Sequence, residues 1–282
     1  MARLVVVIHE FDVFRIQVRS TGKIGSPYLL FDVLKQLESL GHSVHVSRGP
    51  EPANGDAALL HVDSTIVEQP YLDLASHYPR TINFGTGDIS KRATSRLLLA
   101  KGNSWDGPVI VKSNLNNGAT MEDQHNREAA RMGLPPPHPG VAKAESYRIL
   151  DSLSDVEDAV WRDRTLVVER FLPEEDEEGG YVLRTWVFMG SRERCSRVVT
   201  ANKVSKAGAI LRYAPAEVPD ALRRERERLG FDFGKFDFVI HDGKAVLLDA
   251  NRTPGVARRL QSVMDEGARN LAEGLSELLT AE

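Results

Sequence analysis

Residues 235–255 read KFDFVIHDGKAVLLDANRTPG, two apolar runs joined by the dipeptide Asp242-Gly243. This dipeptide between apolar runs is a strong signal for a tight turn, so we predict a β-hairpin here. Asp249 and Asn251 are two residues apart and therefore point to the same face of the second strand. With Asp237 in the first strand, they place three oxygen-bearing side chains in an otherwise apolar hairpin.

The register of this hairpin decides whether the two aspartates can meet. A strict two-residue turn would pair Asp237 with Leu248 and leave Asp249 on the other face of the sheet. We therefore predict an irregularity, either an odd-length loop or a β-bulge, for which Gly243 in a left-handed conformation is well suited. The irregularity would bring the two carboxylates together on one face.

Two carboxylates about 5 Å apart repel by roughly 3 kcal/mol at an effective dielectric of 20, so the arrangement needs a cation. Mg²⁺ prefers oxygen ligands together with substrate phosphates, and a two-metal cluster is an option. The alternative is structural: Asp249 pairs with Arg252 or a lysine, and Asp237 caps a turn. Three oxygen donors at this spacing favour the metal.

The bulk composition is that of an ordinary soluble globular protein. The chain has 282 residues, of which 41% are hydrophobic and 27% charged, and its net charge is −4. This charge gives no general attraction to nucleic acid or to anionic membrane, so we expect neither as a partner. The first apolar run, residues 4–8, is far too short for a signal segment or a membrane span, and we therefore expect a cytoplasmic protein.

Cysteine and histidine usage argues against a transition-metal site. Cys195 is the only cysteine, which excludes an internal disulfide and a cysteine-based metal cage. The eight histidines are scattered, and no pair has the i, i+4 spacing of a zinc-binding helix. We therefore expect no transition-metal centre, and we interpret Cys195 as an ordinary strand residue.

The first third of the chain alternates strand and helix. Residues 3–8, 43–47 and 57–62 are strand-like runs, and leucines recur at helical spacing from Leu30 until Gly41 ends the helix. Such alternation predicts the α/β class, with a parallel sheet whose ligand edge lies beyond the carboxyl ends of the strands. Four polar residues lie at the carboxyl ends of these strands: His9, Glu10, His61 and Asp63. A solvated loop residue is the commoner interpretation of each.

The rest of the chain predicts a second domain. A helix carrying Lys91 and the leucines 97–99 follows the turn residues 85–88, where we place the boundary between domains 1–88 and 89–282. The second domain is richer in strands, which gives it α+β character. Its other expected elements are strands at 109–112, 165–170, 181–188, 236–241 and 245–250, helices at 121–132 and 216–229, a proline-rich connector at 135–140, and a closing helix that buries Leu271, Leu275 and Leu278.

The hairpin residues resemble a known family. Asp237, the Asp-Gly turn, Asp249-Ala250-Asn251 and the following Pro254-Gly255 are similar to the metal-binding end of ATP-grasp ligases such as D-alanine:D-alanine ligase and glutathione synthetase. The resemblance covers the chain from about residue 80 to its end. It implies the ATP-grasp fold, preceded by a Rossmann-like N-terminal domain. It also implies that Asp237, Asp249 and Asn251 bind one or two Mg²⁺ ions, while Arg252 and the Gly255 amide face an acyl phosphate.

Further segments look like nucleotide-binding parts of the same family. The strand ending at Lys112 is similar to the one whose lysine reaches the phosphates, and residues 114–120 would form the loop that covers them. Residues 167–173 resemble the hinge strand, with the hinge near 169–173. Residues 181–188, which carry Arg184, are similar to the family strand whose arginine contacts the γ-phosphate. By this resemblance the ATP-binding residues would be Lys91, Lys112, Glu169 near the adenine amino group, Leu172 through its amide, Asp176 at the ribose, and Leu248.

Each of these residues also has a structural interpretation. A lysine after an apolar strand is commonly just exposed, and Arg184 could pair with a neighbouring carboxylate because an unpaired guanidinium in an apolar run is costly. Most of the acidic run 174–178 would be a solvated loop. Three cationic residues could hold an acidic substrate, and the sequence does not choose between them: Arg197, Lys203 and Arg212.

The resemblance implies an ATP- and Mg²⁺-dependent carboxylate–amine ligase that works through an acyl phosphate. Its substrates would be a small carboxylate and an amine, such as an amino acid or a short peptide. Family members are often dimers, so a homodimer is implied as an option. Two alternatives stay open: a phosphotransferase on the same scaffold, and a module that binds ATP without turnover. We find no Ser-His-Asp or Cys-His arrangement and therefore reject a hydrolase.

Overall fold

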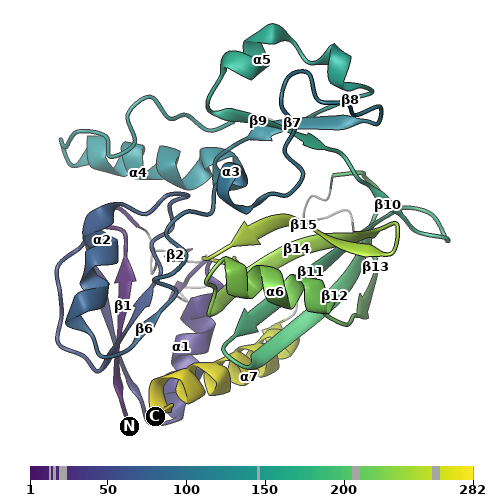
Figure 1. Cartoon of the computed structure of the whole chain (residues 1–282). Helices are drawn as coiled ribbons and strands as arrows, with labels where there is room; N and C mark the ends of the chain where they lie inside the picture. Colours follow the sequence, from purple (N-terminus) through teal and green to yellow (C-terminus); the bar gives the residue numbers. More distant parts are fainter. Residues whose placement is uncertain are drawn as a thin grey trace.

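The computed structural model describes residues 1–12, 14, 17–18, 24–144, 147–204, 210–255 and 261–281. Within them, the molecule is built from three main sheets with their helices, namely the N-terminal sheet, a small sheet and a large sheet, together with one two-stranded sheet (Figure 1). In the view of Figure 1 the small sheet lies above the other two. Among the described residues, no helix is both long and apolar enough to cross a membrane.

The N-terminal sheet is parallel, as the sequence predicts. Its strand order is β4-β1-β5-β6, formed by Ser43–Arg48, Arg3–Ile8, Ala57–Leu60 and Thr81–Ile82. One face is covered by α2 (Gln69–Asp73) and the 3₁₀ helix η1 (Leu74–His77), which bury Tyr71 and Leu74 against β1 and β5. A short hairpin, β2 (Gln17–Val18) and β3 (Ile24–Gly25), follows β1 in the chain.

The other face of the N-terminal sheet is covered from both ends of the chain. Helix α1 (Leu29–Ser39) packs beside α7 (Gln261–Thr280) in Figure 1. Leu271 and Leu275 of α7 join Leu30 of α1 in one core cluster, which also includes Met189 and Phe233 of the large sheet. The two predicted domains therefore share a hydrophobic core.

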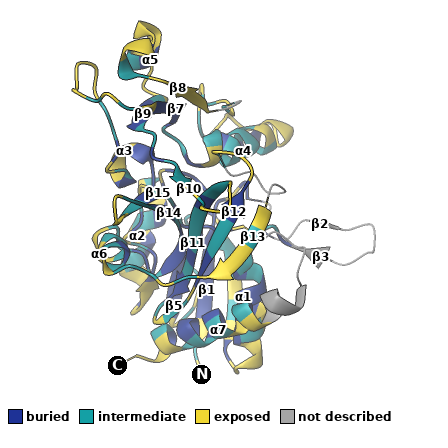
Figure 2. Cartoon of the chain, turned by 90° about the vertical axis from the view of Figure 1, so that its right-hand side faces the viewer, coloured by how far each residue is buried: buried dark blue, intermediate teal, exposed yellow. Residues whose placement is uncertain are grey.

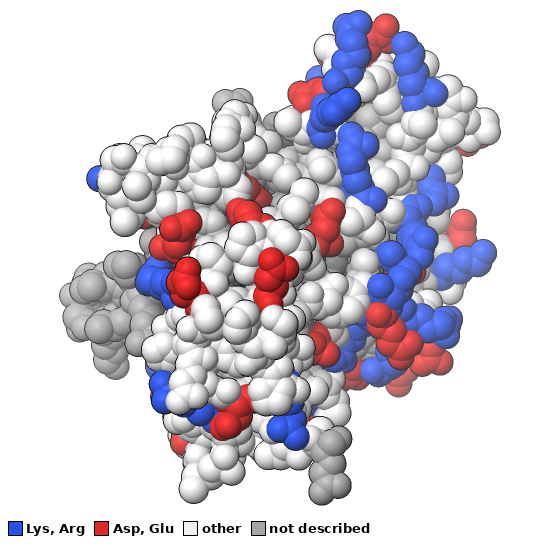
Figure 3. Space-filling view, turned by 60° about the vertical axis from the view of Figure 1, so that its left-hand side comes forward, with Lys and Arg blue, Asp and Glu red and all other residues white. Residues whose placement is uncertain are grey.

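The small sheet is antiparallel, with β7 (Val109–Ser113) between β8 (Arg148–Leu150) and β9 (Leu166–Arg170). Four short helices and one longer helix surround it: α3 (Lys91–Thr94), η2 (Asn116–Ala119), η3 (Leu153–Asp155), α5 (Asp158–Arg162) and α4 (Thr120–Arg131). Seen from the side of the N-terminal sheet, Lys and Arg gather at the top of the molecule and down one edge, while Asp and Glu are scattered over the rest (Figure 3).

The helix expected to run from Lys91 to the leucines 97–99 is a single turn. Ser90 caps α3 by accepting from the Ala93 amide, but Ser95 is already extended. Beyond it the chain pairs with β9 instead, because the Arg170 amide donates to Leu97 O (2.9 Å) and the Leu99 amide donates to Val168 O (2.9 Å). Tertiary pairing here overrides local helix propensity.

The large sheet is antiparallel, with the order β13-β12-β11-β14-β15 and β10 paired to β11. Its strands are β10 (Glu174–Glu175), β11 (Tyr181–Met189), β12 (Arg192–Thr200), β13 (Ile210–Pro215), β14 (Phe233–His241) and β15 (Lys244–Asn251). Helix α6 (Asp220–Arg228) covers one face over an aromatic cluster that includes Trp186, Phe188 and Phe236. Figure 2 shows β13 as an exposed edge strand. Burial raises the pKa of Cys195 to about 11, as suits an unreactive thiol.

The predicted irregularity in the hairpin is present, but it lies within the strand and not at the turn. The turn is a two-residue one, with Asp242 at φ 49° and Gly243 at φ 71°. The register shifts between Asp237 and Phe238, so that Asp237 pairs with Asp249 and Leu248 is the extra residue. This β-bulge brings the two aspartates onto one face.

Buried His61 should make the protein sensitive to acid. It follows β5 and is fully buried, and burial lowers its pKa from 6.5 to about 3. Between these values the unfolded chain binds a proton that the folded chain does not, so stability falls as the pH falls through this window. From pH 7 to pH 5 we expect a loss of about 2 kcal/mol from this residue.

Urea unfolding of the wild type and His61→Leu at both pH values measures this contribution. The variant should lose about 2 kcal/mol less on acidification. Exposed His77 provides the control, and His77→Leu should behave like the wild type. Equal losses in the wild type and His61→Leu would contradict the prediction.

Candidate active site

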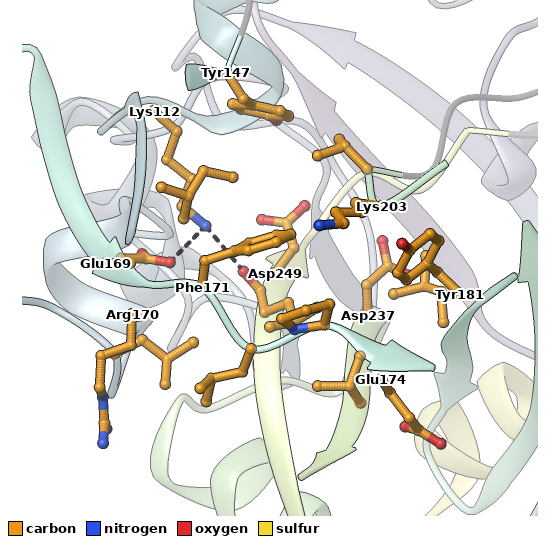
Figure 4. Close-up of a pocket in the computed structure, with 18 of the residues that line it drawn as sticks. Lys112, Tyr147, Glu169, Arg170, Phe171, Glu174, Tyr181, Lys203, Asp237 and Asp249 are labelled. Atoms are coloured by element: carbon orange, nitrogen blue, oxygen red, sulfur yellow. Dashed lines mark hydrogen bonds and ion pairs between the residues drawn. The ribbon is translucent and has the colours of Figure 1, made fainter. Parts of the chain in front are cut away.

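A cavity of about 200 Å³ opens between the small sheet and the large sheet. Strands β7 and β9 form one wall, while β11, β14 and β15 form the other. Ten of its lining residues are labelled in Figure 4: Lys112, Tyr147, Glu169, Arg170, Phe171, Glu174, Tyr181, Lys203, Asp237 and Asp249. We call it the first cavity. Its lining also contains Lys91, Leu172 and Leu248, so seven of the residues expected from the sequence meet here.

Lys112 and Glu169 form a buried ion pair on the wall made by the small sheet. Lys112 Nζ lies 2.8 Å from Glu169 Oε2, and it also donates to Leu248 O at 3.4 Å (Figure 4). Leu248 is the bulged residue, so the bulge turns a carbonyl toward this lysine. Glu169 Oε1 is buried without a hydrogen-bond partner among the described residues. A buried acceptor of this kind is costly unless a ligand donor reaches it.

Asp249 is neutralised by Lys91. The lysine projects from the first turn of α3 and is 6% exposed, and the two side chains form an ion pair. Burial lowers the pKa of Lys91, but Asp249 more than reverses this, so its pKa is raised. Burial raises the pKa of Asp249, and Lys91 with other lysines reverses it, so that pKa is lowered. Both groups are therefore charged at neutral pH.

Asp237 has its own cationic partner, which the sequence interpretation missed. Lys235 Nζ lies 2.7 Å from Asp237 Oδ2, and Thr185 Oγ1 donates to Asp237 Oδ1 at 2.9 Å. Burial lowers the pKa of Lys235 and Asp237 raises it, with a net increase. Lys235 could have been found from its spacing, because it is two residues from Asp237 and shares its strand face. Two adjacent carboxylates are thus each balanced by a lysine.

Arg184 and Asp176 do not line the first cavity, although Glu174, the ion-pair partner of Arg184, does. Arg184 meets Glu174 with two hydrogen bonds, one of 2.8 Å between Nη2 and Oε1. Asp176 pairs with Arg197 and Arg212. In this conformation Arg184 therefore pairs with a neighbouring carboxylate, which is the structural alternative to contacting the γ-phosphate. Asp176, expected at the ribose, does not line the first cavity.

Arg252 is a fully buried structural residue. Its guanidinium donates to the carbonyls of Val62, Ser64 and Thr86, with Arg252 Nη2 2.6 Å from Ser64 O. Burial lowers its pKa to about 10, which leaves it charged at neutral pH. It does not line the first cavity, and it joins the end of β15 to the segments that follow β5 and β6. The expectation that Arg252 faces an acyl phosphate is therefore wrong for this conformation, because its guanidinium is held by backbone carbonyls.

Asn251 and Gly255 line a second cavity of about 350 Å³. Asn251, the last residue of β15, lies two residues beyond Asp249. The lining residues are Pro27, Tyr28, Asp63, Ser64, Thr65, Asn116, Asn117, Met121, Glu122, Gln124, Asn251, Thr253 and Gly255. This described lining contains two carboxylates and neither lysine nor arginine. Burial raises the pKa of Asp63, which accepts from Thr253, so a cation entering the cavity would favour its charged form.

The loop between β7 and α4 borders the second cavity and contains left-handed backbone conformations. Asn117, Gly118 and Ala119 all have positive φ, at 46°, 64° and 64°. Two of the three carry a Cβ, and left-handed conformations of such residues are sparsely populated and cluster at ligand-binding segments. The backbone amide of Asn116 donates to Thr65 Oγ1 at 2.8 Å, which fixes the loop to the segment that follows β5.

Comparison of the sequence with family models finds no match, and comparison with curated proteins finds none either. Solved structures do match, over nearly the whole chain. The ATP-grasp ligase PsnB with its minimal precursor has a TM-score of 0.55 at 14% identity, covering 98% of this chain and 99% of PsnB. PsnB with the precursor, Mg and ADP gives 0.53 at 13% identity, covering 98% and 97%.

Two further structures agree. D-alanine–D-alanine ligase from Bacillus anthracis complexed with ATP has a TM-score of 0.53 at 12% identity, covering 99% of this chain and 97% of the ligase. A RimK domain ATP-grasp protein from Sphaerobacter thermophilus gives 0.52 at 14% identity, covering 98% and 100%. The mixed architecture of parallel and antiparallel sheets agrees with these neighbours. The chain therefore has the ATP-grasp fold, as the residues of its hairpin predicted.

Proposed function

We propose that the chain is an ATP- and Mg²⁺-dependent carboxylate–amine ligase. The observation that carries this proposal is the bulged pairing of Asp237 with Asp249, opposite Lys112 in the first cavity. Similar structures that contain ATP, or Mg and ADP, support the same ligands here. Asp237 and Asp249 fit Mg²⁺ because adjacent carboxylates supply the hard oxygen ligands it prefers. Asn251 would add a third oxygen from the end of β15.

The first cavity suits a nucleotide. Its apolar part, which includes Ile110, Phe171 and Leu172, would take the adenine ring, with the Leu172 amide and the unpartnered Glu169 oxygen at its polar edge. Lys112 and Lys91 would meet the phosphates at the other end. Mg²⁺, when bound, neutralises phosphate charge. Lys91 would then exchange its bond to Asp249 for one to a phosphate oxygen.

The reaction proceeds in two steps. A substrate carboxylate oxygen attacks the γ-phosphorus of ATP, the bond to ADP breaks, and an acyl phosphate forms. An amine then attacks the acyl carbon, inorganic phosphate leaves, and the amine loses a proton to give an amide. Fixed positive charge from the lysines stabilises the first transition state, and the Gly255 amide would stabilise the oxyanion in the second.

We assign the amine substrate to the second cavity. Its two carboxylates, Asp63 and Glu122, favour a cationic group, and a group bound there would lie beside Asn251 and Gly255, next to the end of β15. An amino acid or a short peptide carries such a group as its α-amine. The amine would reach the acyl carbon after losing a proton, and an adjacent carboxylate can accept that proton.

Release of ADP with a panel of carboxylates, with and without amines, tests this function. A ligase releases ADP in proportion to amide product and needs both substrates. Acceptor-independent formation of a stable phosphorylated product would instead favour a phosphotransferase. Nucleotide binding without turnover across a panel of amino acids and peptides would favour a binding module and overturn the proposal.

Removing the charge of Glu122 should weaken amine binding. Glu122 Oε1 accepts from the Thr65 amide at 2.6 Å, and Glu122→Gln keeps an acceptor there while losing the charge. A hydrogen bond to a charged group is worth about 1.5–3 kcal/mol, so we expect KM for the amine to rise about tenfold to hundredfold. KM for ATP should stay within about twofold.

Glu128→Gln is the matched control, because Glu128 lies on the same helix but outside the second cavity. It should leave KM for the amine unchanged. An unchanged KM in Glu122→Gln would remove this residue from the acceptor site.

A further inference from the structure

Three histidines that are far apart in the sequence meet at the end of the N-terminal sheet. His9 follows β1, His125 lies on α4, and His138 lies in the proline-rich connector. Each offers a ligand atom, and these atoms all lie within 4.8 Å of one another. His9 is 1% exposed and His125 is 0% exposed. The cluster lies outside both cavity linings, so the proposed ligase chemistry does not account for it.

The histidines contact one another and a carboxylate. The His9 and His125 rings stack at 3.9 Å, and His125 Nδ1 lies 3.4 Å from His138 Nε2. Glu68 Oε1 lies 3.7 Å from His9 Nε2 and 3.9 Å from His138 Nδ1. Four potential ligands thus converge from the ends of β1 and α2, from α4 and from the connector.

Two polar atoms of this group are buried and unpartnered. His125 Nε2 and Glu68 Oε2 have no hydrogen-bond partner among the residues that the structure describes. Buried polar atoms without partners are rare and call for an explanation, such as a bound ion. Burial lowers the pKa of His125 to about 2, so its ring is neutral at physiological pH and keeps a lone pair for a metal.

We propose that His9, His125, His138 and Glu68 bind one divalent transition-metal ion of the Zn²⁺ type. Imidazole nitrogens with one carboxylate oxygen are a common tetrahedral donor set for such ions. Mg²⁺ prefers oxygen ligands, so this site and the proposed magnesium site differ in the metal that they select.

Binding requires a small local rearrangement. Zn–N bonds of about 2.0–2.1 Å place ligand nitrogens about 3.3 Å apart, so histidine ligand atoms that now lie within 4.8 Å of one another must close by up to about 1.5 Å. One of the stacked rings must also turn, because an ion cannot lie in the planes of two parallel rings. The Phe11 amide donates to His9 Nδ1 at 3.2 Å, so the proton of neutral His9 is on Nε2. On binding through Nε2, that proton moves to Nδ1 and this hydrogen bond is lost.

The surroundings provide support for the ligands and an entry path. Asn126 holds the backbone of His138 from both sides, donating to its carbonyl (2.8 Å) and accepting from its amide (2.9 Å). The side chains of Glu68 and His138 are 37% and 12% exposed, so the ion can enter between them. A bound ion would tie α4 to the N-terminal domain. Because α4 carries Glu122, it would also fix one wall of the second cavity.

The test is a calorimetric titration of the chelator-treated full chain with Zn²⁺. Excess Mg²⁺ is present throughout, so that the carboxylates of the first cavity are already occupied. We expect one Zn²⁺ per chain. His138→Gln, whose side chain is partly exposed, should bind at least 100-fold more weakly while its circular dichroism stays that of the wild type. Co²⁺ should give the intense visible absorption of a tetrahedral site in the wild type and not in His138→Gln.

Two controls separate this site from others. His241→Gln, at the end of β14 next to the hairpin turn, should keep wild-type zinc affinity, and so should Asp249→Asn in the first cavity. The proposal is overturned if the wild type takes up no stoichiometric Zn²⁺, or if His138→Gln binds it equally well. Neither result depends on ligase activity.

Discussion

Replacing Asp249 with asparagine should lower kcat for ADP release by about a thousandfold. The substitution keeps the size of the side chain and an acceptor for Lys91, but it removes the negative charge proposed to bind Mg²⁺. A metal contributes several kcal/mol of charge stabilisation in the transition state, and about 4 kcal/mol corresponds to this factor. Steady-state kinetics at saturating ATP measure the effect, and raising the Mg²⁺ concentration should restore part of the rate.

Asp242→Asn is the matched control on the same hairpin. Its side chain is 88% exposed at the turn, and the same chemical change there should leave kcat within about twofold. Thermal unfolding of both variants checks that the fold is intact. Wild-type kcat in folded Asp249→Asn would remove the metal assignment.

Replacing Arg252 with methionine should destabilise the protein by roughly 3–5 kcal/mol. The change leaves three buried carbonyls, those of Val62, Ser64 and Thr86, without their donor, and each buried acceptor left unpaired costs about 1–3 kcal/mol. At about 2–4 °C per kcal/mol for a large domain, Tm should fall by roughly 10 °C. Calorimetry or urea unfolding measures it.

Arg131→Met provides the comparison, because the Arg131 side chain is 77% exposed and pairs with Glu128 across one helical turn. An exposed pair of this kind is worth less than about 1 kcal/mol, so Tm should barely change. Arg252→Met with unchanged Tm but a large loss of kcat would show that Arg252 acts on the substrate and not on the domain packing.

The hairpin shows which features local sequence patterns can predict and which they cannot. The Asp-Gly turn, the two strands and the need for an irregularity are all readable from alternation, because side chains in a strand alternate with a period of two. The position of the irregularity was not readable. An extra residue at the turn and an extra residue within the strand would both bring Asp237 opposite Asp249. Only the packing of β15 against its neighbours places the extra residue at Leu248.

Partners that lie far apart in the sequence account for the other differences. A buried guanidinium needs acceptors, but nothing near Arg252 in the sequence indicates that these are carbonyls of residues 62–86. The residues after Ser95 have helical composition, yet β9 offers them strand hydrogen bonds. The eight histidines have no motif spacing, and three of them meet because β1, α4 and the connector come together at one place.

By itself, the sequence determined the alternation of strands and helices, the acidic hairpin and the resemblance that predicted the ATP-grasp fold. These follow from periodicity and turn chemistry, which act over a few residues. Only the tertiary structure decided that Lys91 balances Asp249, why Arg252 is buried, and where the histidines converge. Such contacts join elements separated by tens to hundreds of residues, and their geometry depends on how whole sheets and helices pack.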